Sequence, residues 1–230
     1  MGTFLIMANI ILVIGETGSG KTTSLAKVDK KNTFLIRITD KDLPWEGWKK
    51  DFSPYDKASG TGNMVTTHSA VTVAKALALA KADEKYKLVV VDDLQYLMSY
   101  EFMERAQESG WQKFTDIAQN AYNVIAAAKA LRTDQTVVFL CHSTDEYFDG
   151  GRRTKIKTIG KMLDEKITVE GMFTIVLLSQ IEKADDGLKY WFITNSDGTT
   201  TAKSPSGMFP IKIPNDLQAV LDRIEEYNNG

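Results

Sequence analysis

The sequence is poor in the residues that build disulfides and metal clusters. Its 230 residues include one cysteine, Cys141, and two histidines, His68 and His142. A single thiol cannot form an internal disulfide, and this set of residues does not offer the typical spacing of a zinc site. We therefore exclude a disulfide scaffold and a zinc finger, and we expect a reducing compartment, the cytoplasm.

A long apolar run and a large net charge are also missing. No apolar run reaches the ~20 residues that a membrane helix requires, and the apolar start, Met1 to Ile14, lacks the basic segment of a secretory signal. We expect no membrane association. The net charge of −2 gives no general attraction to polyanions, so any contact with nucleic acid must come from a local basic patch.

Short apolar runs rich in β-branched residues alternate with helical patterns along the chain. A composition of 43% hydrophobic and 25% charged residues suits a single globular domain over residues 1–230. Strands are predicted at 9–14, 33–38, 88–91, 136–141 and 173–178. Helices are predicted from about Thr22, from within 63–69 to Ala82, from Trp111 to about Leu131 and from Asn215 to Tyr227.

The intervening segments are less regular. We expect no regular structure from the end of the second strand to about Thr67. Residues 188–194 and 199–202 read as an antiparallel hairpin around Asp197-Gly198, within a C-terminal part that spans 188–230. This order predicts an α/β fold with a mostly parallel sheet, helices on both faces and an antiparallel C-terminal edge.

One glycine-rich segment matches a phosphate-binding pattern. Residues 15–22 read GETGSGKT, the Walker A pattern, between a buried strand and a helix start. Its backbone N–H groups converge on the β-phosphate, Lys21 bridges the β- and γ-phosphates, and Thr22 supplies a hydroxyl to Mg²⁺. No Asn-Lys-x-Asp guanine motif is present, which favours ATP. The predicted nucleotide-binding residues are Gly15, Glu16, Thr17, Gly18, Ser19, Gly20, Lys21, Thr22 and Thr23.

Two later strands end in polar residues. Residues 88–93, LVVVDD, are an apolar strand that delivers Asp92 at its carboxyl end, as expected of a Walker B element that holds Mg²⁺. Asp93 has three interpretations: a catalytic carboxylate, a helix cap or a solvated turn residue. His142 follows the fourth strand, so we predict that it senses the γ-phosphate; a structural histidine is the alternative.

Hydrolysis also needs a carboxylate that positions or deprotonates water. Asp40, just beyond the second strand, is the first candidate because strand ends beside the phosphate loop face the γ-phosphate. Asp93 and Glu46 are the others. An exposed turn residue is the alternative for Asp40.

Walker A, a Walker B ending in Asp92 and a strand ending at His142, in this order, resemble the RecA-like P-loop ATPases. The resemblance is closest to small phage-encoded, AAA-type ATP-binding proteins associated with recombination and single-strand annealing. The resemblance covers most of the chain. Matches that are weaker than the ATP-binding motifs lie at Leu43-Pro44-Trp45, Trp111, Gly160-Lys161 and Lys203-Ser204-Pro205.

The resemblance implies a homo-oligomer, either a ring or a filament, with ATP at the subunit boundary. Lys203 matches the position of a lysine finger that completes a neighbour's γ-phosphate site, and Arg152 and Arg153 are rival candidates. A solvated hairpin lysine is the alternative for Lys203.

Members of this family carry DNA on the loops that follow the Walker B and sensor strands. The second such loop, 143–166, is a basic hairpin in which alternation places three cations on one side of a strand. We predict that single-stranded DNA binds there, through Arg152, Arg153, Lys155 and Lys157, with Tyr147 and Phe148 available to stack bases. A solvated hairpin is the alternative.

These expectations combine into a DNA-stimulated ATPase that acts in phage recombination, annealing or replication, in the host cytoplasm and with a single-strand-binding protein as candidate partner. Two other classes stay open. One is a P-loop kinase of small molecules, although the sequence has little of an arginine-rich lid. The other is a nucleotide-gated assembly factor with little turnover.

Overall fold

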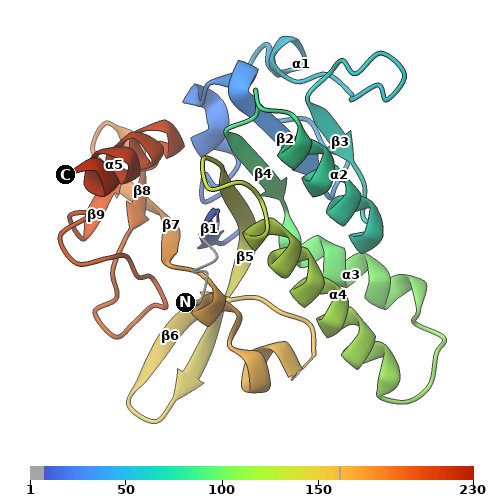
Figure 1. The fold of residues 1–230 in the computed structure, drawn as a ribbon. Helices are drawn as coiled ribbons and strands as arrows, with labels where there is room; N and C mark the ends of the chain where they lie inside the picture. Colours follow the sequence, from blue (N-terminus) through green and yellow to red (C-terminus); the bar gives the residue numbers. More distant parts are fainter. Residues whose placement is uncertain (1–7, 161) are drawn as a thin grey trace, which may run out of the picture.

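The computed structural model describes residues 8–160 and 162–230, and nine strands of one mixed sheet lie within them (Figure 1). The strand order is β3-β2-β4-β5-β1-β7-β8-β9, and β6 pairs with β5. Of the sequence features considered above, residues 1–7 and Lys161 lie outside the described residues. The bounds are β1 (Asn9–Gly15), β2 (Thr33–Arg37), β3 (Met64–Thr66), β4 (Leu88–Asp92), β5 (Thr136–Phe148), β6 (Gly151–Ile156), β7 (Ile175–Ala184), β8 (Gly187–Ile193) and β9 (Lys212–Pro214).

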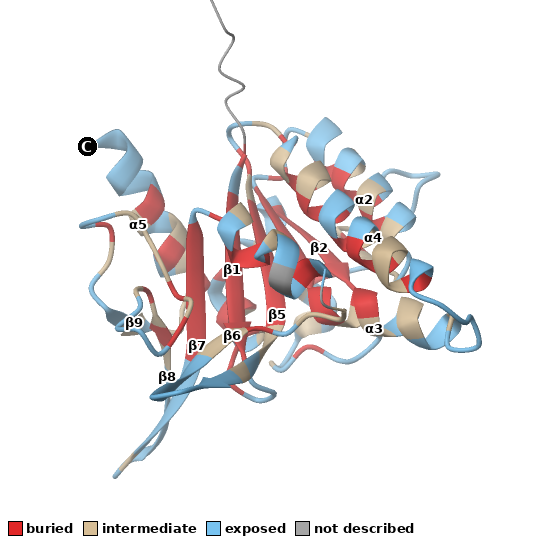
Figure 2. Ribbon diagram, turned by 90° about the horizontal axis from the view of Figure 1, so that it is seen from below, coloured by how far each residue is buried: buried red, intermediate tan, exposed pale blue. Residues whose placement is uncertain are grey.

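Helices cover both faces of the parallel part of the sheet. Side chains alternate along β1: Leu12 and Ile14 pack with α2 and α4, whereas Ile11 and Val13 pack with α5 and η1. Figure 2 shows these strands buried and the outer hairpins exposed. The helices are η1 (Thr23–Lys27), η2 (Lys30–Asn32), α1 (Trp48–Asp51), α2 (Ala70–Ala82), α3 (Leu94–Glu104), α4 (Gln112–Lys129), η3 (Met162–Ile167), η4 (Val169–Met172) and α5 (Leu217–Asn229).

The central strands position the candidate site. β5 lies between β1 and β4, and all three are parallel. Gly15 is in register with His142, and Asp92 with Leu140. The carboxyl ends of the three strands therefore meet at one edge of the sheet. The predicted α/β fold, with its mostly parallel sheet and antiparallel C-terminal edge, is confirmed.

The predicted pairing within the C-terminal edge is wrong. β8 pairs with β7 and β9, not with residues 199–202. Ala184 pairs with Gly187, so two aspartates form a tight turn, and Gly187 takes the positive φ of 125° that this turn requires. Asp197 instead accepts the N–H of Thr199 at 3.0 Å in a local turn.

The predicted first helix is a short 3₁₀ helix of five residues, η1. The hydroxyl of Ser24 donates to the carbonyl of Lys21 at 2.6 Å, and Val28 is extended and buried. Serine and threonine at this position favour such local bonds over a longer helix.

Three further differences concern element bounds. β3 and α1 lie in the segment expected to be irregular, α3 follows Asp93 where no helix was predicted, and β5 continues to Phe148. In the described part of the chain, no helix has both the length and the apolarity needed to cross a membrane.

Candidate active site

The loop that follows β1 encloses the amino group of Lys21. Its Nζ donates to the carbonyls of Gly15 and Glu16, both at 2.8 Å, and the residue is buried. Burial lowers the pKa of Lys21, although the nearby charges of Asp93 and Asp92 oppose this. The ammonium therefore lies inside the loop, where a phosphate group would meet it.

Glycine is required at several loop positions. A Cβ on Gly15 would lie 2.4 Å from Oγ of Ser19 and 2.8 Å from the carbonyl oxygen of Ser179. Gly18 and Gly20 have positive φ values of 80° and 93°. The hydroxyl of Ser179 donates to the carbonyl of Ser19 at 2.6 Å and ties the loop to β7. The loop is thus held close to the sheet in a conformation that side chains larger than glycine's hydrogen would disturb.

Thr22 and Asp92 form a donor set suited to Mg²⁺. The threonine hydroxyl donates to both carboxylate oxygens of Asp92, at 3.2 and 3.3 Å. Burial, followed by the charge of Asp93, raises the pKa of Asp92 to about 6. A buried carboxylate beside a hydroxyl fits a hard cation that also binds phosphates, and no cluster of three or more His, Cys, Asp or Glu suited to a metal exists among the described residues.

Asp93 and His142 form a second polar pair beside the first. Nε2 of His142 lies 2.9 Å from Oδ2 of Asp93, whose side chain is 2% exposed. Oδ1 of Asp93 has no hydrogen-bond partner among the described residues. Asp93 occupies the N-cap of α3, but its side chain makes no capping bond. The ring of Tyr96 packs edge-on against His142 at 5.6 Å.

A cavity of about 410 Å³ joins Lys21, Thr22, Asp93 and His142, whereas Asp92 contacts Thr22 but does not itself line the cavity. Its lining combines phosphate-loop residues with the ends of β2, β4 and β5, and consists of Thr17, Gly18, Gly20, Lys21, Thr22, Thr23, Lys41, Asp42, Pro44, Asp93, Tyr96 and His142. The structure therefore brings together most of the predicted nucleotide site. Sequence reasoning missed Lys41, Asp42 and Tyr96, and the strand-end argument selected Asp40, which does not line the cavity, in place of Lys41.

Other predicted catalytic residues lie outside this cavity. The carboxylate of Asp40 is 85% exposed and pairs with Nη2 of Arg37 at 2.9 Å. Glu46 is exposed. Lys203 forms two backbone hydrogen bonds with Val176 of β7, at 2.8 and 2.9 Å, away from the cavity. Of the three carboxylates considered for water activation, Asp93 is the one that lines the cavity.

The predicted DNA-binding residues lie on the β5–β6 hairpin or directly after it. Arg152 pairs with Asp145 at 3.3 Å, and Arg153 lies over the ring of Phe148 at 5.7 Å. Lys155 pairs with Glu146 at 2.9 Å and with Asp164 at 2.7 Å, which leaves its side chain 16% exposed.

The root of the hairpin reaches the phosphate loop. The backbone N–H of Lys157, just beyond β6, donates to the carbonyl of His142 at 2.8 Å. Arg152, Glu16 and Ser179 line a second cavity, of about 360 Å³, between the hairpin, the loop and β7.

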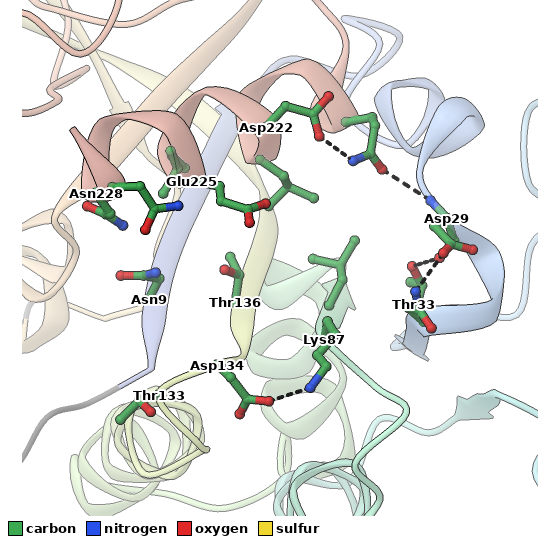
Figure 3. Close-up of a pocket in the computed structure, with 16 residues that line it drawn as sticks. Asn9, Asp29, Thr33, Lys87, Thr133, Asp134, Thr136, Asp222, Glu225 and Asn228 are labelled. Atoms are coloured by element: carbon green, nitrogen blue, oxygen red, sulfur yellow. Dashed lines mark hydrogen bonds and ion pairs between the residues drawn. The ribbon is translucent and has the colours of Figure 1, made fainter.

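A larger cavity of about 660 Å³ lies at the opposite end of the sheet, between the strand starts at Asn9 and Thr136 and helix α5 (Figure 3). Four carboxylates line it, Asp29, Asp134, Asp222 and Glu225. Its basic residue, Lys87, already pairs with Asp134. Because these carboxylates would repel phosphates, this cavity does not suit a triphosphate.

The fold and the site define a P-loop nucleoside triphosphatase of RecA-like architecture. The chain belongs to the AAA domain family, whose model matches residues 7–206. Among solved structures it is similar to the KaiC-like protein of the hyperthermophilic archaeon Pyrococcus horikoshii, with 11% sequence identity and a TM-score of 0.50 over 90% of this chain and 84% of that one. At this identity the likeness shows the fold alone. A search of curated proteins found no match.

Proposed function

We propose that this protein hydrolyses ATP with Mg²⁺, and that single-stranded DNA bound to the β5–β6 hairpin stimulates the hydrolysis. The observation that carries the proposal is the continuity of β5. This strand runs without a break from Thr136 through His142, at the nucleotide cavity, to Phe148, at the turn of the hairpin. A ligand that moves the hairpin can therefore act on the polar pair beside the γ-phosphate.

The residues of the cavity have distinct roles in hydrolysis. Lys21 binds the β- and γ-phosphates, and Thr22 and Asp92 hold Mg²⁺, which when bound neutralises phosphate charge. Oδ1 of Asp93 accepts a proton from the attacking water while His142 holds Oδ2. The water oxygen forms a bond to the γ-phosphorus, the bond to the β,γ-bridging oxygen breaks, and ADP leaves with that electron pair.

The hairpin offers cations and aromatic rings for single-stranded DNA. Arg153 and Phe148 form an exposed cation–ring pair, and Tyr147 beside them is 75% exposed. Such surfaces bind phosphates and stack bases. Lys155 is engaged by two carboxylates, so we expect Arg152 and Arg153 to contribute more than Lys155.

The biological setting is proposed from the order of the motifs. We propose action in phage recombination, annealing or replication, in the host cytoplasm, as a homo-oligomeric ring or filament with a single-strand-binding protein as partner. Lys203 lies away from the cavity of its own protomer, which suits a residue that acts on a neighbour's nucleotide.

The DNA site is tested by replacing Arg152, Arg153, Lys155 and Lys157 together with alanine. The variant should lose both DNA stimulation and the steep salt dependence of binding to single strands. A control of equal charge replaces four exposed lysines elsewhere, Lys31, Lys57, Lys75 and Lys81. Equal losses in both variants, or salt-dependent binding that survives in the first, would show that the DNA site is placed wrongly.

A further inference from the structure

A second lysine, outside the phosphate loop, also lines the nucleotide cavity. Lys41 follows the end of β2 and lines the cavity together with Lys21, Thr22 and Asp93. Lys41 therefore borders the same cavity as the phosphate-binding lysine and the candidate water-activating carboxylate.

The backbone that carries Lys41 is fixed by a buried cation. Nη1 of Arg37, a residue 5% exposed, donates to the carbonyl of Lys41 at 2.7 Å. The same guanidinium donates to Oγ1 of Thr66 on β3 at 3.0 and 3.2 Å. Two residues later, Leu43 is buried in the core cluster that also contains Leu35 of β2 and Phe52. The backbone is therefore anchored at Lys41 itself and again at Leu43.

No carboxylate among the described residues pairs with the ammonium of Lys41. Across residues 8–160 and 162–230, Lys41 forms no ion pair, whereas Lys49 in the same segment pairs with Asp42 at 3.7 Å. A triphosphate in the cavity would supply the missing negative charge. Lys21 would approach it from the loop, and Lys41 from the end of β2.

We propose that Lys41 is a catalytic residue that binds the γ-phosphoryl oxygens of ATP within its own protomer. This inference rests on the proposed hydrolysis of ATP. As the bond to the β,γ-bridging oxygen breaks, negative charge grows on the bridging oxygen, and a cation that reaches both this oxygen and the γ-phosphoryl oxygens stabilises that state more than the ground state. Each protomer then holds two cations of its own at the γ-phosphate, and a finger from a neighbour is a further contribution.

The test compares Lys41→Met with Lys50→Met, which removes a charge from an exposed lysine of α1 outside the cavity. Lys41→Met should lower kcat by about 10²–10³-fold, the loss typical of one transition-state donor, and Lys41→Arg should restore part of it. Lys50→Met should match the wild type.

A second readout separates a catalytic from a structural role. Lys41→Met should bind Mg·ADP within a few-fold of the wild type, but should fail to trap ADP with aluminium fluoride, which imitates the transferring phosphoryl group. Loss of ADP binding and trapping together would show that Lys41 supports the fold of the site, and would overturn the proposal.

Mixing decides between action in cis and in trans. In hetero-oligomers of Lys41→Met and Lys21→Ala protomers, each nucleotide site lacks one of its own cations, so activity should not return. Restored activity would show that Lys41 acts on a neighbour. If the wild type hydrolyses ATP and Lys41→Met is fully active, only the role of Lys41 is overturned. If the wild type shows no hydrolysis that depends on Lys21, the proposed function itself is overturned.

Discussion

The buried carboxylate of Asp92 should make the metal-free protein less stable as the pH rises. In the folded protein its pKa is raised from 3.8 to about 6, mainly by burial. Below both pKa values, Asp92 is neutral in the folded and in the unfolded protein, so it does not lower the free energy of unfolding. Between the two pKa values, Asp92 is ionised in the unfolded chain but still neutral in the folded protein, so the free energy of unfolding falls as the pH rises. The loss is complete above the pKa of the folded protein. At 1.36 kcal/mol per pKa unit, the full cost is about 3 kcal/mol.

Asp92→Asn removes this charge while keeping an oxygen that can accept the Thr22 hydroxyl. In urea unfolding with EDTA, the variant should be more stable than the wild type by up to about 3 kcal/mol near pH 8, and this gain should shrink toward zero near pH 4. Asp40→Asn is the control, because that carboxylate is 85% exposed and its loss should change stability by less than about 1 kcal/mol. With Mg·ATP the wild type should be more stable than Asp92→Asn, because the wild type alone gains stability from the bound metal. A gain that is absent near pH 8, or that does not vary with pH, would refute the reasoning.

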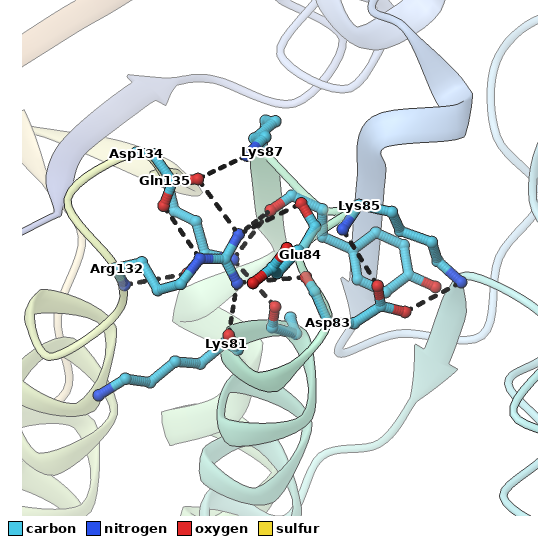
Figure 4. Close-up of polar contacts among 10 residues, drawn as sticks. Lys81, Asp83, Glu84, Lys85, Lys87, Arg132, Asp134 and Gln135 are labelled. Carbon is cyan, nitrogen blue, oxygen red and sulfur yellow. Dashed lines mark hydrogen bonds and ion pairs between the residues drawn. The ribbon is translucent and has the colours of Figure 1, made fainter.

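Three further predictions concern the phosphate loop, the connection between α2 and β4, and the pair formed by Asp93 and His142. Gly15→Ala should destabilise the protein by about 1–3 kcal/mol in urea unfolding and abolish binding of a fluorescent nucleotide, because the new Cβ would lie 2.4 Å from Oγ of Ser19; unchanged binding would contradict the loop geometry. Arg132→Ala should cost about 1–3 kcal/mol of stability but leave nucleotide affinity unchanged, since its guanidinium donates to the backbone carbonyls of Asp83 and Tyr86 between α2 and β4 (Figure 4) and does not line the nucleotide cavity. His142→Ala should lower kcat by about 10²-fold with little effect on the Kd for ATP, because it frees the carboxylate of Asp93; a change confined to Kd would argue for a binding role.

The parts of the site that are local in sequence could be predicted, and those that depend on tertiary contacts could not. Residues 15–22 and 88–93 form the loop and the strand end that their patterns predict, since both signals need only neighbouring residues. Lys41 was missed because its position depends on the buried guanidinium of Arg37, which holds its carbonyl. The same guanidinium pairs with Asp40, whose carboxylate lies outside the cavity.

Two elements of the fold show the same limit. Asp186-Gly187 and Asp197-Gly198 are equivalent turn signals in the sequence, and the extension of β7 to Ala184 selects the first as the hairpin turn. Helix α3 was not predicted because Gln95 on its buried face interrupts the apolar pattern. That side chain donates to the hydroxyl of Ser99 at 2.7 Å, a bond that makes its burial tolerable.

The central claim is that hydrolysis at the Lys21 site is coupled to DNA on the hairpin. The most direct measurement is the rate of ATP hydrolysis by the wild type and by Lys21→Ala, each with and without single-stranded DNA. The account predicts that DNA raises the wild-type rate and that Lys21→Ala abolishes hydrolysis under both conditions. Lys21-dependent hydrolysis that is indifferent to DNA would contradict the coupling.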